Sequence, residues 1–269
     1  MSAHPVARTL RGFSQALART LVSEDAAHAR GLLQGIDPRV KLVGMMALVV
    51  ASALSHRVDT LLELLAVGVG LAMMSRVSLW SLARRVWLVA FVFSFMIAAP
   101  AMFLTPGVVV WRWGWLAATA PGVHTAALLV LRVEAAVTLS TLLVLTTPWM
   151  WLLKALRTLW VPVEVIALLA MTHRYVVLLA ETANQMFESR QSRMVGRVKG
   201  REQRHMMINT GGVLLSKTMA MGDEVYMAML ARGFRGEVRL LAEFRMKGRD
   251  WLMGAALLML AVAAVVAGR

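Results

Sequence analysis

Apolar residues along the chain gather into four segments within the first 150 residues and a fifth near the C-terminus. The segments cover residues 40–54, 60–74, 87–104, 123–147 and 251–267. About 20 apolar residues cross a typical hydrocarbon core, and fewer suffice where the ends snorkel or the bilayer thins. Leu, Val, Ala and Met dominate, which favours helices over the alternating strands of a barrel. The pattern predicts an all-α, polytopic membrane protein with about five transmembrane helices.

A long interval before the fifth segment has apolar residues at helical spacing that charged residues interrupt. Glu164, Arg174 and Glu181 interrupt its first half, and Lys217 and Asp223 its second. Unpaired ions at mid-bilayer are costly, so we expect long amphipathic helices at the membrane surface. The predicted organisation is a cytoplasmic leader, transmembrane helices 1–4, a cytoplasmic and interfacial helical module and a C-terminal transmembrane helix, in residues 1–35, 36–150, 151–250 and 251–269.

The distribution of Lys and Arg predicts the orientation of the chain. Basic residues concentrate in the leader and in the second and fourth loops (Arg8, Arg11, Arg19, Arg30, Arg39, Lys41, Arg76, Arg84, Arg85, Lys154, Arg157). The first and third loops hold only Arg57 and Arg112. By the positive-inside rule the N-terminus is cytoplasmic, and five spans leave the C-terminus outside the cell (inner) membrane. The basic start has no apolar core behind it, so no cleaved signal peptide is expected.

Composition narrows the function classes. The chain is 59% hydrophobic and 16% charged, with net charge +14, whereas soluble domains carry about 25% charged residues. The basic residues flank apolar runs and carry no nucleic-acid-binding motif, so a lipid bilayer, and not nucleic acid, is the expected partner. No cysteine is present, and the six histidines have no i, i+4 pairs. A metal site or a cysteine nucleophile is therefore not expected.

Two arginine-centred stretches in the interval are the strongest candidates for function. The first is Ser189-Arg190-Gln191 followed by Arg193, and the second is Ala231-Arg232-Gly233 followed by Arg235. An arginine fork can pair bidentately with a carboxylate, a small residue permits close approach, and glycine allows a sharp exit from a helix. These features suit short helices that dock into a partner, with Gly200 as a possible cap of the first. The alternative is that the arginines bind lipid phosphates.

Ionisable residues also occur inside the fourth apolar segment. Arg132 and Glu134 are two positions apart, so they point to different faces of a helix and need separate partners. Glu63 is a candidate partner for Arg132, and Arg174 for Glu134. We interpret both as intramembrane bracing, because the chain offers no residues for an ion pathway. Farther along, Gly211-Gly212 is either a hinge or a close crossing point.

The paired arginine stretches, with three further motifs, resemble one known family. The further motifs are GIDPRVKL at residues 35–42, HRYVVLLAE at 173–181 and YMAMLARGFRGE at 226–237. Over residues 35–240 the chain resembles the transmembrane T component of energy-coupling factor (ECF) transporters, most closely the cobalt-transport Q subunit. T components for nickel or for a vitamin remain alternatives. Ser189 and Gln191 depart from the small residues usual in the first motif.

The resemblance implies a non-enzymatic subunit of an ATP-driven importer. Its two arginine motifs would insert into two ABC-type ATPase subunits, and a separate membrane subunit would bind the substrate. This chain would bind no cofactor, with ATP and Mg on the ATPases, which agrees with the absence of a GxxxxGK[ST] loop. Two other classes are a membrane-embedded enzyme acting on lipid or peptide and a scaffold protein. The sequence holds neither His-Glu-x-x-His nor Gly-x-Ser-x-Gly for such an enzyme.

Overall fold

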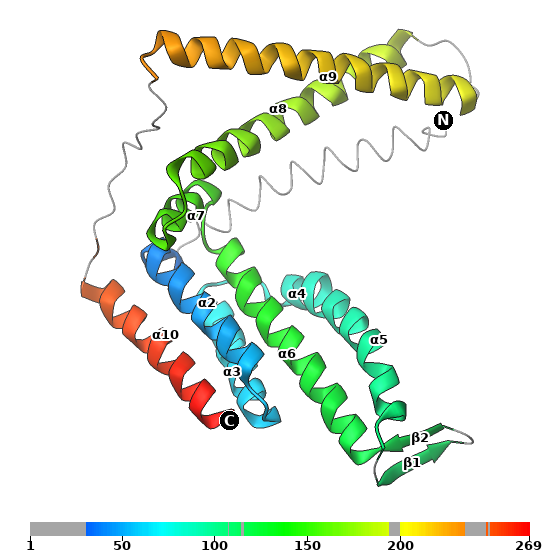
Figure 1. Ribbon diagram of the computed structural model, residues 1–269, viewed down its shortest axis with the longest axis vertical. Helices are drawn as coiled ribbons and strands as arrows, with labels where there is room; N and C mark the ends of the chain where they lie inside the picture. Colours follow the sequence, from blue (N-terminus) through cyan, green and yellow to red (C-terminus); the bar gives the residue numbers. More distant parts are fainter. Residues whose placement is uncertain (1–30, 107, 114–115, 194–199, 235–245, 247) are drawn as a thin grey trace. The chain divides into compact units, whose positions relative to one another are not determined.

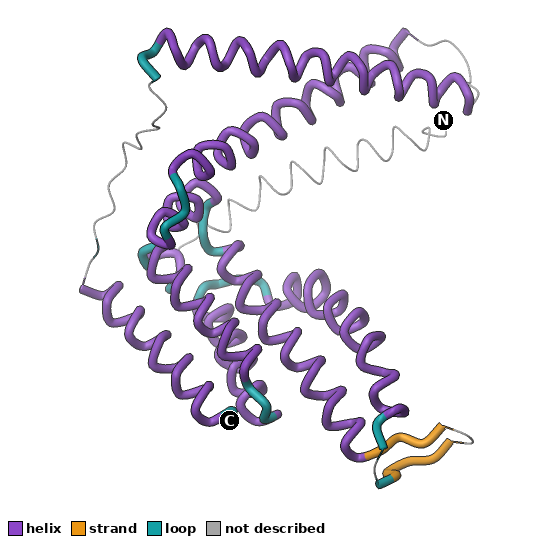
Figure 2. Tube along the Cα trace, viewed as in Figure 1, coloured by secondary structure: helices purple, strands orange, loops and turns teal. Residues whose placement is uncertain are grey.

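The computed structural model describes the chain except residues 1–30, 107, 114–115, 194–199, 235–245 and 247. It divides into two compact units, each considered by itself. The first unit, here called the bundle, comprises Glu24–Ala155 and Phe244–Arg269. The second comprises Met1–Ser23 and Leu156–Glu243, and its described helical part is here called the module. Figure 1 labels the helices and strands, and Figure 2 shows how strongly helices dominate.

Five long helices form the described part of the bundle. They are α2 (Pro38–Leu54), α3 (Val58–Met74), α5 (Leu88–Leu104), α6 (Ala120–Leu145) and α10 (Gly248–Ala267). Shorter elements join them: η1 (Leu33–Gly35), α4 (Leu79–Leu82), the π-helix η2 (Ala83–Trp87) and α7 (Trp149–Leu156), with η3 (Arg157–Leu159) following. Leu48, Leu61 and Leu139 are fully buried between the helices, whereas Met96 on α5 is 75% exposed. Apolar side chains thus cover both the inside and the outside of the bundle, as expected where lipid is the solvent.

Local sequence explains where the first and fourth long helices begin. Asp37 precedes α2, and its carboxylate accepts a hydrogen bond of 2.9 Å from the backbone N–H of Arg39. Thr119 precedes α6, and its hydroxyl accepts one of 3.3 Å from Gly122. In both cases a proline follows within the first two helical positions. An oxygen-bearing cap followed by proline is the usual start of a helix, because neither residue needs an intrahelical N–H bond.

The first and last helices of the bundle run parallel and end together. At one end the backbone N–H of Asp37 donates to Asp250 Oδ1 at 3.1 Å. At the other end the N–H of His56 donates to the carbonyl of Gly268 at 2.9 Å. Between these ends the helices pack closely, since a Cβ added at Gly44 would lie 2.6 Å from Leu257. The 17 residues of α2 therefore extend about as far as the 20 residues of α10.

Length and composition single out three described helices as candidate membrane spans: Ala120–Leu145, Val163–Met186 and Gly248–Ala267. Leu88–Phe103 is a shorter apolar helix. These helices confirm an all-α membrane protein. The number of five spans stays a prediction, because α2 and α3 have 17 residues each.

The assignment of residues 163–186 as a candidate span differs from the sequence analysis, which placed an amphipathic surface helix there. Their polar residues are too few to lower the hydropathy of so long an apolar stretch.

A short β-hairpin replaces the plain loop expected after the third apolar segment. Strands β1 (Val109–Trp113) and β2 (Leu116–Thr119) pair antiparallel, with Val109 opposite Thr119 and Trp113 opposite Leu116. The hydroxyl of Thr119, which begins α6, donates to the carbonyl of Thr105 at 2.8 Å. The hairpin therefore links the end of α5 to the start of α6 in a sheet of two strands (Figure 1).

Two long helices make up the described part of the module. They are α8 (Val163–Arg193) and α9 (Gly200–Ala231). Sequence analysis expected short helices around the two arginine motifs, with Gly200 ending the first. Instead each motif lies at the C-terminal end of a long helix, and Gly200 begins α9. Residues 163–193 and 200–231 contain no proline, so nothing stops either helix on the N-terminal side of its motif.

Candidate functional site

The second arginine motif ends α9 in a defined turn. The N–H of Phe234 donates to the carbonyl of Met229 at 3.0 Å, and the N–H of Gly233 to that of Leu230 at 2.9 Å. Gly233 has φ of 81°, in the left-handed region. This pair of bonds closing over a left-handed glycine is a Schellman motif, in which Arg232 is the C-cap residue. The helix thus ends at Gly233, as the sequence predicts.

The turn leaves the arginine of this motif accessible and well placed electrostatically. Ala231, Arg232 and Gly233 are all exposed. The C-terminal end of a helix carries partial negative charge, which favours a cation at this position. Because the turn satisfies the carbonyls of Met229 and Leu230 with backbone N–H groups, these acceptors do not require the Arg232 guanidinium as a cap. Arg235 lies outside the described residues.

The first arginine motif lies at the equivalent end of α8. Ser189, Arg190, Gln191 and Arg193 all belong to the last turns of this helix, and the Ser189 side chain is exposed. The hydroxyl of Ser192 donates back to the carbonyl of Ser189 at 2.8 Å. The structure therefore brings both motifs into one unit, each at a helix C-terminus.

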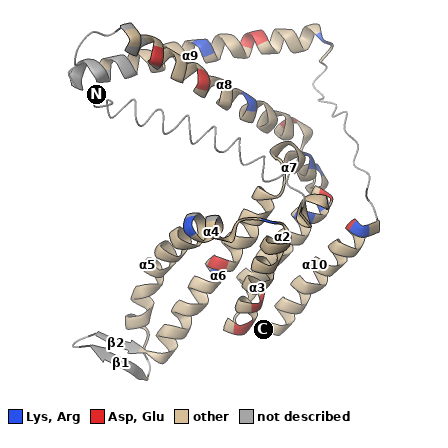
Figure 3. Ribbon diagram, turned by 180° about the vertical axis from the view of Figure 1, so that it is seen from behind, with Lys and Arg blue, Asp and Glu red and all other residues tan. Residues whose placement is uncertain are grey.

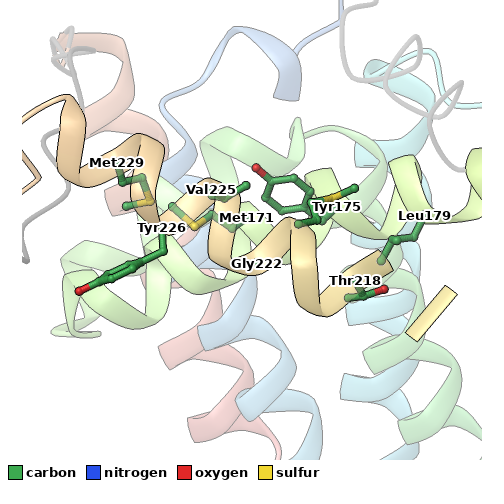
Figure 4. A pocket seen from close by; sticks show the side chains of 9 residues that line it. Met171, Tyr175, Leu179, Thr218, Gly222, Val225, Tyr226 and Met229 are labelled. Carbon is green, nitrogen blue, oxygen red and sulfur yellow. The ribbon is translucent and has the colours of Figure 1, made fainter. Parts of the chain in front are cut away.

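An apolar groove of about 370 Å³ runs between α8 and α9. Figure 4 shows side chains of both helices gathered around it. Its lining residues are Met171, Tyr175 and Leu179 of α8 and Thr218, Met221, Gly222, Val225, Tyr226 and Met229 of α9. The Thr218 hydroxyl is already bonded to the carbonyl of Leu214 at 2.7 Å, so the groove offers mainly apolar contact. Met229 lies three residues before Arg232, so the groove reaches the second motif.

Sequence reasoning missed this groove, although the chain carried a signal for it. The protein has only two tyrosines, and both line the groove. Their spacing to Met171 and Met229 places each pair one helical turn apart on a face. Lys217, Asp223 and Glu224 of α9 are exposed. Figure 3 shows where charged residues of both signs occur along α8 and α9.

The Gly211-Gly212 pair lies within the continuous helix α9. No described atom would lie within 4 Å of a Cβ added at either glycine. The described part of the chain thus shows no close crossing there.

Arg132 and Glu134, on α6 of the bundle, lie in different surroundings. Arg132 Nη2 donates to the carbonyl of Ser55, the C-cap residue of α2, at 2.7 Å. Among the described residues no ion pair joins Arg132 to Glu63, so the suggested partner is replaced by a backbone carbonyl. Glu134 is 7% exposed, and its Oε1 has no hydrogen-bond partner among the described atoms. Their role in bracing stays a prediction.

The described residues contain no group of three or more His, Cys, Asp or Glu side chains that could hold a metal ion.

Comparisons with known proteins place these features in context. Residues 30–241 match the family model for CbiQ, described as cobalt transport protein. The chain is 31% identical to an uncharacterized protein of Methanocaldococcus jannaschii, covering 90% of this chain and 85% of that protein. It is 27% identical to the energy-coupling factor transporter transmembrane protein EcfT of Lacticaseibacillus paracasei, covering 84% of this chain and 90% of EcfT. For EcfT of Limosilactobacillus fermentum the identity is 29%, over 76% and 80% of the two chains.

Proposed function

Since the chain belongs to the CbiQ family, as a T component of ECF transporters, we propose that it couples two ABC-type ATPases to a substrate-binding membrane subunit. It catalyses no reaction itself, and ATP and Mg bind to the ATPases. The observation that carries the proposal is the exposed Arg232 on a closed turn at the end of α9. A preorganised arginine loses little freedom when it pairs with a carboxylate, so more of the contact energy contributes to affinity.

The second arginine motif at the end of α8 gives the same chemistry a second site. Two motifs in one unit match two ATPase subunits, each receiving one helix end. Helix C-termini repel anions unless a cation intervenes, which makes Arg190 and Arg232 the natural contacts for acidic partner surfaces. When the ATPases move, these rigid helix ends carry the displacement along α8 and α9.

Chain geometry supports a module that stays on one side of the membrane. Thr146, after α6, and Asp250, in α10, both bond to the first turn of α2 and so lie at the same end of the bundle. A crossing by α8 would require a second crossing before Asp250. Among the described helices α9 is not a candidate span, and the undescribed stretches 194–199 and 235–245 are far shorter than the roughly 20 residues needed. We infer that α8 does not cross.

The charge of this part of the chain indicates the side. Residues 181–250 contain 13 Lys and Arg against 8 Asp and Glu. By the positive-inside rule the module lies in the cytoplasm, where the ATPases bind, with the N-terminus on the same side of the cell (inner) membrane.

The apolar groove between α8 and α9 is the proposed contact for the substrate-binding subunit. Its lining is apolar and rich in methionine, and methionine side chains repack easily when a partner shifts. The proposed substrate is the cobalt ion, supported by the family's description. Nickel or a vitamin are the alternatives. Cobalt uptake by cells that depend on this chain decides between them.

The experiment for the proposal is co-purification of the ATPases with the double variant Arg190→Glu/Arg232→Glu from detergent. We expect the variant to insert and fold normally but to lose both ATPases, because the substitutions invert the charge at both helix ends. Lys217→Glu, an exposed charge reversal within α9, is the matched control and should keep them. Retention of the ATPases by the double variant would refute the assignment and favour lipid phosphate as the ligand of these arginines.

A further inference from the structure

The first turn of α2 bonds to the last long helix of the bundle before the module and to the first helix after it. Lys41 Nζ donates to the carbonyl of Thr146 at 2.9 Å, at the end of α6, after which α7 leads to the module. Four residues earlier, the N–H of Asp37 donates to Asp250 Oδ1 at 3.1 Å, where the chain returns in α10. Arg249 Nη2 adds a bond of 3.2 Å to the carbonyl of Gly35. These six residues are here called the inner clamp.

Burial makes the inner clamp strong and specific. Lys41 is 1% exposed, Asp250 4% and Asp37 8%. Buried polar groups are costly to leave unpaired, so each contact resists opening. Thr146 is the C-cap residue of α6, and an ammonium group at that position also meets the negative end of the helix.

The bundle contains a second contact of the same chemistry in a different place. Arg132 of α6 donates to the C-cap carbonyl of α2 at Ser55, whereas Lys41 of α2 donates to the C-cap carbonyl of α6 at Thr146. Both contacts join a cation to a helix C-terminus across the same pair of helices. The two contacts differ in position and in burial: the buried Lys41 contact lies at the end of α2 that also bonds to Asp250, whereas the part-buried Arg132 contact lies at the other end of α2.

We propose that Asp37, Lys41 and Asp250 are positioning residues that transmit the module's movement to the bundle. The inference rests on the proposed coupling function. A displacement of α8 and α9 that passes along the chain enters the bundle through α7 and α6 on one side and through α10 on the other, and α6 and α10 are both bonded to one helical turn of α2. When the contacts of the inner clamp are intact, that displacement moves α2, α6 and α10. When these contacts are broken, the module can move without moving the three helices.

The test measures the distance between a spin label in the module and one in the bundle. The chain has no cysteine, so Ala228→Cys on α9 and Met259→Cys on α10, both exposed, give the only two labels. Distances are measured by pulsed electron paramagnetic resonance for the chain alone and for its complex with the ATPases, with and without ATP and vanadate. The clamp variants are Lys41→Met and Asp250→Ala, which break the two connections independently.

We expect both clamp variants to broaden the distance distribution and to lose the nucleotide-dependent shift while the ATPases remain bound. Asp250→Asn keeps an oxygen that can accept from Asp37 and should restore the distribution. Arg132→Met is the matched control and should retain the shift, although it also removes a part-buried cationic contact between α2 and α6. A general loss of bundle stability would affect Arg132→Met as well, so the control separates positioning from stability.

Unchanged distributions in both clamp variants, or equal broadening in Arg132→Met, would overturn the inference. If the unsubstituted chain failed to bind the ATPases, the proposed function would fail instead. The broadening in the chain alone would still decide whether the clamp positions the module. If one clamp variant failed to fold, as judged by size-exclusion chromatography, the other would carry the test.

Discussion

Replacing Gly233 by alanine should loosen the end of α9 without removing an arginine from either motif. Gly233 has φ of 81°, a conformation in which a Cβ approaches the following carbonyl. No other described atom lies within 4 Å of a Cβ added there, so the expected cost comes from the backbone conformation. A left-handed non-glycine residue costs about 1–2 kcal/mol, which corresponds to a factor of about 5–30 in the equilibrium between the closed and open turn.

Hydrogen exchange measures this opening directly, because the two bonds of the turn are donated by the N–H groups of Gly233 and Phe234. In Gly233→Ala the amides of residues 233 and 234 should exchange about 5–30 times faster than in the unsubstituted chain. The affinity for the ATPases should fall by at most the same factor, since only the closed turn presents Arg232 in its bound position. Binding is measured with the chain in nanodiscs and the ATPase in solution.

Gly212→Ala provides the matched control on the same helix. Gly212 has no left-handed φ, and no described atom lies within 4 Å of a Cβ added there. Alanine in a helix interior is about 1 kcal/mol more favourable than glycine, so α9 should become more stable and ATPase affinity should not fall. If Gly233→Ala left amide exchange unchanged, the Schellman turn would not be what holds Arg232, and this explanation of the motif would be wrong.

Two further predictions concern the bundle and the topology. Gly44→Ala places a Cβ 2.6 Å from Leu257 Cδ1 and 2.9 Å from its Cβ, so it should destabilise the chain by about 1–3 kcal/mol in detergent unfolding, as overpacking does. Gly70→Ala on α3, with open space around it, should not, and equal stability of the two variants would exclude a tight crossing of α2 and α10. Single cysteines at Ile208 on α9 and at Leu168 on α8 should both react with a membrane-impermeant maleimide only from the cytoplasmic side, although Leu168 can be slowed by lipid. Labelling of either from outside would contradict a module confined to the cytoplasm.

Sequence reasoning was most reliable where one pattern decides a structure locally. The third apolar segment was predicted at 87–104 and α5 covers Leu88–Leu104. The last was predicted at 251–267 and α10 covers Gly248–Ala267. Gly233 was expected to end a helix, and its left-handed φ confirms this. In these cases neighbouring residues carry all the information that the element needs.

The predictions that were wrong or not made concern contacts that no local sequence pattern encodes. Arg132 was expected to pair with an acidic side chain, but its partner is the carbonyl of Ser55. Because every residue has a backbone carbonyl, the sequence does not indicate which carbonyl an arginine will bind. Gly200 was expected to end a helix, although glycine can also begin one, as it does in α9. The groove between α8 and α9 requires two helices, distant in sequence, to lie side by side. The contacts of Arg190 and Arg235 with the ATPase subunits stay a prediction.

The reciprocal contacts of Lys41 with Thr146 and of Arg132 with Ser55 lock the register between α2 and α6. The two helices run antiparallel, so sliding one along the other by even part of a 5.4 Å turn stretches both contacts together. This pair of helices therefore cannot move by shear, which is the sliding of packed helices past one another. The two helices must therefore move as one rigid body, and any bending of the bundle has to occur at the other helices or at the loops.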